Sequence, residues 1–388
     1  MIGPFSPSAA GARWASGLAR TLAFFAALCI CTSASAGEPV APDARITSTA
    51  HLLAGMGTDY KPHAQIAALD AWQKHRKQLA PRWARLQRER LSVIEAWRND
   101  ALRAELDRCQ TLLYPFSGPD FLNAYVLFPR CDTYVLFGLE APGDVPALEG
   151  LSAEDAAALL DDTRVALKDL LARNYFITKH MSEQLKTPRL TGVLPLMLAS
   201  MSLLDLRVAA VEPFDLAQFP GPRPAASVNP ARRAKGVKVT YFRPPAGKPQ
   251  TLYYLSLDVT DRALRANPEF LPFLKQFKPS MTFIKSASYL LQAKEFAGTL
   301  QTLLDVSEVL VQDDTGIPYA RLRDRNFEIS LFGRYEPPIS EFPNAYQNDL
   351  AAAYQQSENV SALPFSFGYH WKPGTSALII ARNTAKRS

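Results

Sequence analysis

The chain has 388 residues, of which 47% are hydrophobic and 21% are charged, which is usual for a globular protein. Its formal net charge of +6 is mild for this length and does not favour a nucleic-acid partner. These values exclude a disordered or strongly basic chain and leave a globular protein long enough for two lobes.

The N-terminus has the three parts of a secretory signal peptide. Arg13 and Arg20 supply the positive region, an apolar run (LAFFAALCIC) follows, and Ala34–Ala36 offer small side chains to a signal peptidase. The apolar run is about ten residues long, whereas a membrane-spanning helix takes about 20. We therefore expect an exported protein, periplasmic or extracellular, that is cleaved before Gly37 and has no transmembrane segment in its mature chain.

Two of the four cysteines would leave with the signal peptide, and Cys109 and Cys131 would remain. In an oxidising compartment such a pair predicts a disulfide bond, with two buried thiols as the alternative. The bond would close a loop of about 22 residues and stabilise the fold by on the order of 3 kcal/mol.

Hydrophobic periodicity predicts helices and strands along the whole remaining chain. Helices are expected over residues 62–107 with an interruption at Pro81, then over 154–173, 175–185, 192–206, 268–277 and 281–311. Strands are expected over 133–139, 237–242, 251–258 and 327–332, and as a hairpin of 365–371 with 376–381. A Pro- and Ala-rich linker is expected over 213–235.

Two parts of the chain resemble each other. Residues 135–140 (VLFGLE) align with 253–258 (YYLSLD), and both predicted strands end in a carboxylate. A chance match of apolar segments is the alternative to an internal duplication. We interpret the fold as α/β, with α+β as the alternative, and divide the mature chain into three parts. These are an N-terminal helical segment (37–110), a first α/β half (111–222) and a second half with the C-terminal hairpin (223–388).

The motifs that would identify an enzyme class are missing. The sequence has no G-x-S-x-G, no G-x-x-x-x-G-K-[ST] and no H-E-x-x-H. The five histidines are scattered and the cysteines are not closely spaced, so we expect no zinc site and no bound cofactor.

The turn Tyr114–Asp120 (YPFSGPD) is the first candidate site. Its two prolines and its glycine would place Ser117 and Asp120 rigidly, as in a ligand-binding loop. A tight turn between a helix and a strand, capped by the aspartate, needs the same residues and is the alternative.

The segment Gln312–Tyr319 (QDDTGIPY) is the second candidate. The adjacent carboxylates of Asp313 and Asp314 suit a divalent cation, or an acid and a base whose pKa values are pushed apart. An ordinary turn that stops a helix has the same composition. We include Tyr319 among the ligand-binding candidates.

The C-terminal aromatic residues and the basic helix 62–107 give weaker candidates. Phe365, Phe367, Tyr369 and Trp371 could stack on sugar rings or pack in the core, and His370 opposite them could act as a base. The basic face of the helix could meet anionic lipids or cell-wall polymers, with a solvated face as the alternative.

Glu140 and Asp258 follow the two aligned strands. Because ligands of open α/β sheets bind at the carboxyl ends of the strands, we expect these acids at a cleft between the halves. If three or more of Asp120, Glu140, Asp258, Asp313 and Asp314 line one cavity, a catalytic function gains support, and if they scatter across the surface it fails.

Four segments together, YPFSGPD, YVLFGLE, VQDDTGIPY and LFGRYEPPI, resemble a group of exported bacterial proteins that have no established activity. The resemblance covers most of the mature chain from about Trp72 onward and implies no substrate, cofactor or catalytic residue.

Two functions remain open. The first is a non-enzymatic envelope protein that binds a small polar ligand or an envelope component in the cleft. The second is an extracytoplasmic hydrolase that uses clustered carboxylates, with or without a divalent cation.

Overall fold

The computed structural model describes residues 41–173, 175, 185, 187, 189–218, 234–245 and 247–386. The expected signal peptide, most of the expected helix 175–185 and most of the expected linker lie outside the described residues. Residues 40–388 form one compact unit.

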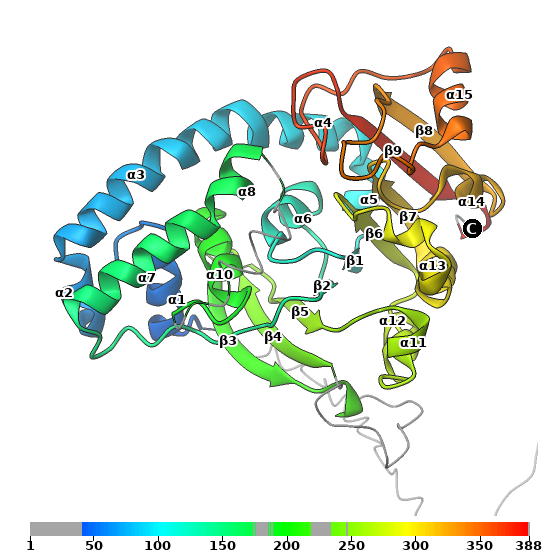
Figure 1. Ribbon diagram of the computed structural model, residues 1–388. Helices are drawn as coiled ribbons and strands as arrows, with labels where there is room; N and C mark the ends of the chain where they lie inside the picture. Colours follow the sequence, from blue (N-terminus) through cyan, green and yellow to red (C-terminus); the bar gives the residue numbers. More distant parts are fainter. Residues whose placement is uncertain are drawn as a thin grey trace, which may run out of the picture. The chain divides into compact units, whose positions relative to one another are not determined.

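A nine-stranded mixed sheet runs through this unit, with the strand order β3-β4-β5-β2-β1-β6-β7-β9-β8 (Figure 1). The strands are β1 (Thr111–Pro115), β2 (Thr133–Gly138), β3 (Arg207–Phe214), β4 (Lys235–Phe242), β5 (Gln250–Ser256), β6 (Ser280–Ile284), β7 (Ser307–Gln312), β8 (Phe327–Gly333) and β9 (Ala377–Asn383).

Helices cover both faces of the sheet. On one side are α1 (Ala44–Leu53), α3 (Asp70–Leu86), α4 (Ser92–Ala101), α6 (Phe121–Leu127), α7 (Ala153–Ala166), α8 (Lys168–Arg173) and α10 (Leu194–Leu203). On the other are α11 (Asp261–Leu264), α12 (Phe270–Lys275), α13 (Ala297–Val306), α14 (Tyr319–Arg323) and α15 (Asn348–Gln356). Short elements join them: η1 (Lys61–His63), α2 (Ala64–Ala67), η2 (Gln87–Leu91), α5 (Arg103–Leu106), η3 (Leu216–Gln218), η5 (Leu290–Gln292), η6 (Lys294–Phe296) and η7 (Thr384–Lys386).

The five central strands are parallel and lie in the order β5-β2-β1-β6-β7. Along the chain this is the order 3-2-1-4-5 of doubly wound sheets, and it reverses direction at β1. Antiparallel strands extend the sheet at each end, β3 and β4 beside β5, and β9 and β8 beside β7. The α/β class expected from the sequence is confirmed.

The strands of the two expected halves lie in one continuous sheet, and those of the first half do not stay together. β3 is separated from β1 and β2 by β4 and β5, which belong to the second half. The aligned segments 135–140 and 253–258 are neighbouring strands, and Val135 pairs with Tyr253 in the register of the alignment. The duplication itself stays a prediction.

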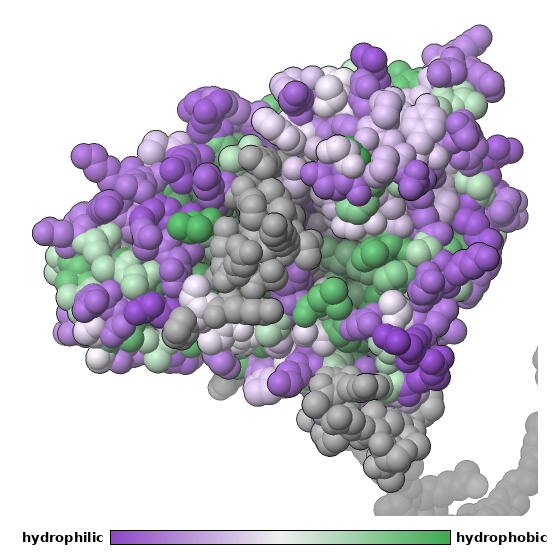
Figure 2. Space-filling view, in the orientation of Figure 1, coloured by the Kyte–Doolittle hydropathy of each residue, from purple (hydrophilic) through white to green (hydrophobic). Residues whose placement is uncertain are grey.

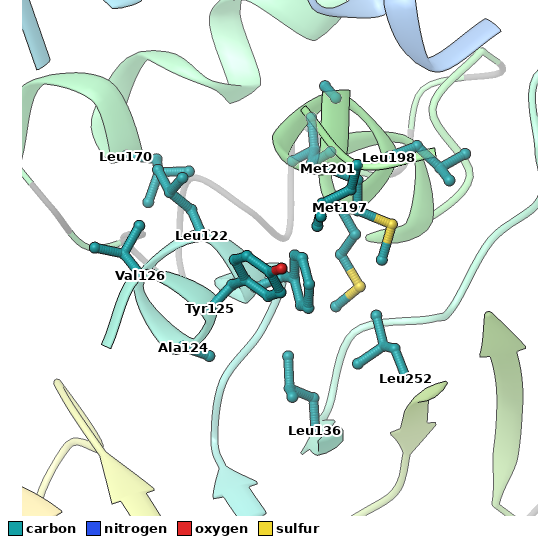
Figure 3. Close-up of a cluster of buried hydrophobic side chains, with 14 of the residues drawn as sticks. Leu122, Ala124, Tyr125, Val126, Leu136, Leu170, Met197, Leu198, Met201 and Leu252 are labelled. Carbon is teal, nitrogen blue, oxygen red and sulfur yellow. The ribbon is translucent and has the colours of Figure 1, made fainter. Parts of the chain in front are cut away.

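Side chains alternate between the two faces of the central strands. Tyr134 and Leu136 of β2 point into one core cluster, whereas Val135 and Phe137 point into the other. In Figure 3, residues of α6, α10 and α8 gather above Leu136 of β2 and Leu252 of β5. A sheet buried on both faces explains the nearly continuous apolar runs of its strands.

Pro81 does not interrupt its helix, and the expected break there is wrong. α3 continues through Pro81 to Leu86, and the irregular turn comes later, as the π-helical η2. Proline removes the hydrogen bond to the carbonyl of Lys77. Lys77 and Pro81 are both exposed, so water can bind that carbonyl.

The helix expected over 281–311 is also wrong, because the segment contains β6, β7 and only one long helix, α13. Both strands are buried at every position. A short apolar strand with two buried faces has no alternation, so its sequence pattern resembles that of a buried helix.

The hairpin expected from 365–371 and 376–381 is not formed. Gly368 adopts a left-handed conformation (φ 66°) and a bridge between Phe367 and His370 closes a tight turn there. The second expected strand exists as β9, but it pairs with β7 and β8.

Cys109 and Cys131 form the expected disulfide bond, with a sequence separation of 22 residues. They precede β1 and β2, so the bond ties the amino ends of the two central strands together. Within the described ranges, no helix combines the length and apolar character needed to cross a bilayer.

Candidate functional site

A cavity of about 490 Å³ opens at the carboxyl ends of the parallel strands. Four strand ends surround it: those of β1, β2, β5 and β6, so it sits where the strand order reverses. Figure 2 shows hydrophobic residues around a hollow in the region where Figure 1 places the ends of β5 and β6. We call it the switch-point cavity. Its polar and charged lining residues are Tyr114, Ser117, Asp120, Glu140, Tyr175, Asp258, Thr260, Lys285, Ser286 and Ser288.

The turn after β1 forms one wall. Phe116 and Gly118 both have left-handed backbone conformations, with φ of 56° and 50°. The N–H of Ser117 donates to the carbonyl of Phe137 at 3.1 Å, which fastens the turn to the end of β2. Phe116 is one of six described non-glycine residues with positive φ, and such strain clusters at functional sites.

Asp120 anchors the floor of the cavity. Its Oδ1 accepts hydrogen bonds from the backbone N–H of Asn123 (3.2 Å), which caps α6, and from the Asn123 amide (2.8 Å). Its Oδ2 accepts from the Tyr114 hydroxyl (2.9 Å) and lies 2.5 Å from Nζ of Lys285. The capping role expected as the alternative is therefore present, together with a buried ion pair that the sequence did not predict.

Burial shifts the pKa values of the two titratable partners of Asp120, which are Lys285 and Tyr114. Desolvation lowers the pKa of Lys285, and the charge of Asp120 acts against this shift. Desolvation, with Asp120 beside it, raises the pKa of Tyr114 well above its usual value. Lys285 and Asp120 form a buried ion pair at the floor of the cavity.

Glu140 lies two residues beyond the end of β2, and its carboxylate turns back over Gly138. A Cβ at Gly138 would lie 2.9 Å from Oε2 of Glu140, so only glycine leaves room for this conformation. The Tyr254 hydroxyl donates to the carbonyl of Glu140 at 2.9 Å and holds the segment in place. Burial raises the pKa of Glu140 above its ordinary value. Glu140 is therefore a carboxyl group that holds its proton more tightly than usual.

Asp258 follows β5, the neighbour of β2, and is exposed. Its Oδ1 accepts from the N–H of Thr260 at 2.9 Å, an arrangement that shapes the loop before α11. Because β2 and β5 are in parallel register, Glu140 and Asp258 line the same cavity, as expected from the strand ends.

The turn after β6 forms another wall of the cavity and is strained. Ser286, Ser288 and Tyr289 all have positive φ, between 52° and 57°. The Ser286 N–H donates to Oδ2 of Asp313 (2.8 Å), and the Ala287 N–H donates to Oγ1 of Thr315 (2.7 Å). The segment after β7 therefore holds this wall in shape.

Asp313 and Asp314 lie behind that wall and do not line the cavity. Asp313 also accepts from the N–H and the hydroxyl of Thr315, and Asp314 accepts from the Tyr289 hydroxyl at 2.6 Å. Desolvation raises the pKa of both carboxyls, and for Asp313 the neighbouring charge of Asp314 adds to the rise. Their described hydrogen bonds support a positioning role for the pair.

The C-terminal turn covers Asp313. A Cβ at Gly368 would lie 2.1 Å from Oδ2 of Asp313, and the Tyr369 hydroxyl contacts the Ser286 carbonyl and the Ser288 hydroxyl, each at 2.9 Å. His370 is outside the cavity lining, and burial lowers its pKa.

The remaining aromatic candidates divide between core and surface. Phe365 and Phe367 are buried, as the core alternative predicted, whereas Trp371 is 42% exposed. Tyr319 starts α14 and packs against the second core cluster, and it is not among the residues that line the cavity.

Four of the predicted site residues line the cavity: Ser117, Asp120, Glu140 and Asp258. Three of these are carboxylates, which meets the condition stated for a catalytic function. Lys285 and Ser286 were missed because their segment was expected to be helical. A signal was present, since a polar KSAS sequence directly follows the apolar run MTFI. Among the described residues, no group of three acids, histidines or cysteines is placed to hold a metal ion.

Comparisons of the chain with protein-family models, with curated protein sequences and with solved structures gave no match.

Proposed function

We propose that the protein binds a small nucleoside-like ligand, with sugar hydroxyls, a flat ring and no net negative charge, in the switch-point cavity. The observation that carries this proposal is Glu140, a partly buried acid that follows the second strand of a 3-2-1-4-5 sheet and lines the cavity. In nucleotide-binding sheets of this order, an acid about 20 residues after the first turn hydrogen-bonds the ribose.

The charge of the cavity favours an unphosphorylated ligand. Asp120, Glu140 and Asp258 line it, whereas Lys285 is already paired with Asp120. Among the described lining residues, a phosphate would meet the carboxylates of Glu140 and Asp258 and no cation other than the paired Lys285, and like charges at close range repel each other.

The walls suit a flat ring. Phe116, Leu257 and Phe296 line the cavity beside the polar groups, and Leu139 at its edge is 68% exposed. An apolar cavity with a few placed polar groups is the usual form of a small-molecule site.

Calorimetric titration with adenosine and with AMP tests the proposal. Adenosine should bind at least about tenfold more tightly than AMP, and Glu140→Ala should weaken adenosine binding by about tenfold, the effect of losing one hydrogen bond to a charged group. Glu154→Gln, a change at an exposed residue of α7, serves as the control. Tighter binding of AMP, or no effect of Glu140→Ala, contradicts the proposal.

The second candidate is a carboxylate-dependent hydrolase acting on the same ligand. It is favoured by three carboxylates in one cavity and by the raised pKa of Glu140, which suits a general acid. Incubation with adenosine, followed by chromatography for free adenine, tests it. Turnover that is lost in Glu140→Gln and in Asp258→Asn supports the enzyme, and tight binding without turnover supports the binding protein.

Export is proposed separately. The N-terminal sequence pattern supports it, and the Cys109–Cys131 disulfide fits an oxidising compartment. Mass spectrometry of the protein from its native cells should find a mature chain that begins at Gly37. An intact N-terminus would contradict this proposal and leave the cavity's chemistry unaffected.

A further inference from the structure

A second pocket, of about 590 Å³, lies apart from the switch-point cavity and shares no lining residue with it. It is formed by α3, η2 and α8 together with the segment 363–374. We call it the basic pocket. Two features that are distant in sequence meet here: the basic face of the long helix and the exposed end of the C-terminal aromatic segment.

The charges of the basic pocket are mostly positive. Arg82, Arg85, Arg90 and Lys168 line it, with Glu89 as the only acid among its described lining residues. Glu89 is already engaged, because Nε of Arg85 lies 2.7 Å and Nη2 of Arg88 lies 3.0 Å from its oxygens. Arg82, Arg90 and Lys168 therefore leave an excess of positive charge.

Arg90 is the least solvated of these cations. Its Nη2 donates to the carbonyl of Leu170 at 3.0 Å, while its Nε is buried and has no hydrogen-bond partner in the part of the chain that the structure describes. Desolvation lowers the pKa of Arg90 to about 10, and the charge of Asp120 acts against this shift. The charge of a poorly solvated guanidinium is stabilised by an anion nearby, and Arg90 lines the pocket.

Trp371 supplies the other half of the site. Its side chain is 42% exposed, and Pro364, Phe365 and Pro373 line the pocket beside it. An indole face presents a flat apolar surface on which the C–H face of a sugar ring can pack.

We propose that the basic pocket binds an acidic saccharide unit, with its sugar ring against Trp371 and its carboxylate facing Arg90, Arg82 and Lys168. The planar guanidinium group matches a carboxylate with two parallel hydrogen bonds, which a neutral sugar cannot provide. Because the exposed indole of Trp371 offers a flat apolar surface, the pocket favours a ligand with a sugar ring over a small anion without one. The site is independent of the ligand proposed for the switch-point cavity.

Calorimetric titration of the full chain with trigalacturonic acid tests the proposal, with a neutral trisaccharide as the comparison ligand. We expect binding of the acidic trimer only, and binding that weakens between low and high salt because exposed charges are screened. Equal binding of the neutral trisaccharide, or no binding of the trimer at millimolar concentration, overturns the proposal.

Two variants and a control locate the site. Trp371→Ala and the double variant Arg82→Gln/Lys168→Gln should each weaken trimer binding by about tenfold or more. Arg82 and Lys168 are exposed, so their replacement should leave the fold intact. The control is Lys61→Gln/Arg265→Gln, which removes the same charge from exposed positions elsewhere and should bind within about twofold of the wild type. Equal losses in the double variant and the control contradict the assignment.

A separate measurement tests whether the basic pocket binds a lipid surface instead of a saccharide. Sedimentation with phosphatidylglycerol vesicles should leave the protein in solution. Vesicle binding that is lost in Arg82→Gln/Lys168→Gln, without binding of the trimer, would show that the pocket recognises a lipid headgroup and would overturn the proposal.

Discussion

Nζ of Lys285 lies 2.5 Å from Oδ2 of Asp120, and both side chains are almost fully buried at the floor of the switch-point cavity. The two residues follow neighbouring parallel strands, β1 and β6, so the sheet itself brings them together. Tyr114 and Asn123 donate further hydrogen bonds to the same carboxylate.

Removing one member of this pair should be costly. We expect Lys285→Met to lower the free energy of unfolding by about 3–5 kcal/mol, because a buried charge loses its partner. The double variant Lys285→Met/Asp120→Asn should recover part of this loss. Urea unfolding of both variants checks the expectation. A double variant less stable than Lys285→Met would show that the ion pair is not what stabilises the floor.

Replacement of Asp313 and of Asp314 by asparagine should lower the free energy of unfolding by different amounts. Both oxygens of Asp313 accept hydrogen bonds, one from the N–H of Ser286 and the other from the N–H of Thr315. In Asn one of these oxygens is replaced by an NH2 group, which would face an N–H donor and could not accept its hydrogen bond. Asp313→Asn should therefore cost about 1–3 kcal/mol. Asp314→Asn can still accept from Tyr289 through its oxygen and should cost less. Urea unfolding compares the two, and a reversed order would contradict the assigned contacts.

Stability should fall as pH rises through the window set by this acid pair. Burial raises the pKa of both carboxyls above the ordinary value of 3.8, so the folded state binds more protons than the unfolded state in that window. The pair's contribution to stability is then fully present below about pH 4 and is lost as pH rises through the raised pKa values. Asp314→Asn should flatten this dependence in unfolding curves measured from about pH 5 to about pH 8. An unchanged slope in the variant would be evidence against a titrating pair.

Two glycine substitutions should separate ligand binding from stability. In Gly138→Ala the new methyl group meets the flexible carboxylate of Glu140 at 2.9 Å, so it should displace Glu140 and weaken adenosine binding with little loss of stability. In Gly192→Ala it meets the Ala141 carbonyl at 2.3 Å, a backbone atom that cannot move easily. Gly192→Ala should cost about 1–3 kcal/mol. Thermal unfolding and calorimetry together distinguish the two effects, and similar stability losses in both would count against this interpretation.

Loss of the disulfide should affect stability and leave the cavity unchanged. Cys109→Ser/Cys131→Ser should lower the free energy of unfolding by about 3 kcal/mol, because it releases the constraint on a loop of 22 residues. The bond lies at the amino ends of β1 and β2, whereas the cavity lies at their carboxyl ends. Adenosine affinity of the folded variant should equal that of the wild type, and a large change in affinity would contradict this separation.

Part of the site was predictable from the sequence because the signals were local. Glu140 and Asp258 each follow an apolar strand, and carboxyl ends of parallel strands meet at one edge. The capping role of Asp120 was readable from its position after a Pro- and Gly-rich turn. These three acids line one cavity as a result.

The rest depended on contacts between distant residues. The pairing of Lys285 with Asp120 joins two strands that only the folded sheet makes neighbours. β6 and β7 were expected to be helical because both faces of each strand are buried and their sequences do not alternate. The sequence of the strand expected over 365–371 includes a glycine, and a glycine inside a strand pattern often marks a bend. Gly368 is that bend.

The order of the strands also determines whether fragments of the chain can fold independently. β1, β2 and β3 precede β4 in the chain, yet β4 and β5 separate β3 from β2 in the sheet. A chain divided between β3 and β4 would give two fragments, each of which lacks hydrogen-bonding neighbours that the other carries. Neither fragment should fold alone, and mixing the two should restore the sheet. Because residues 40–388 form one compact unit, we expect the two ends of the sheet to lose their structure together.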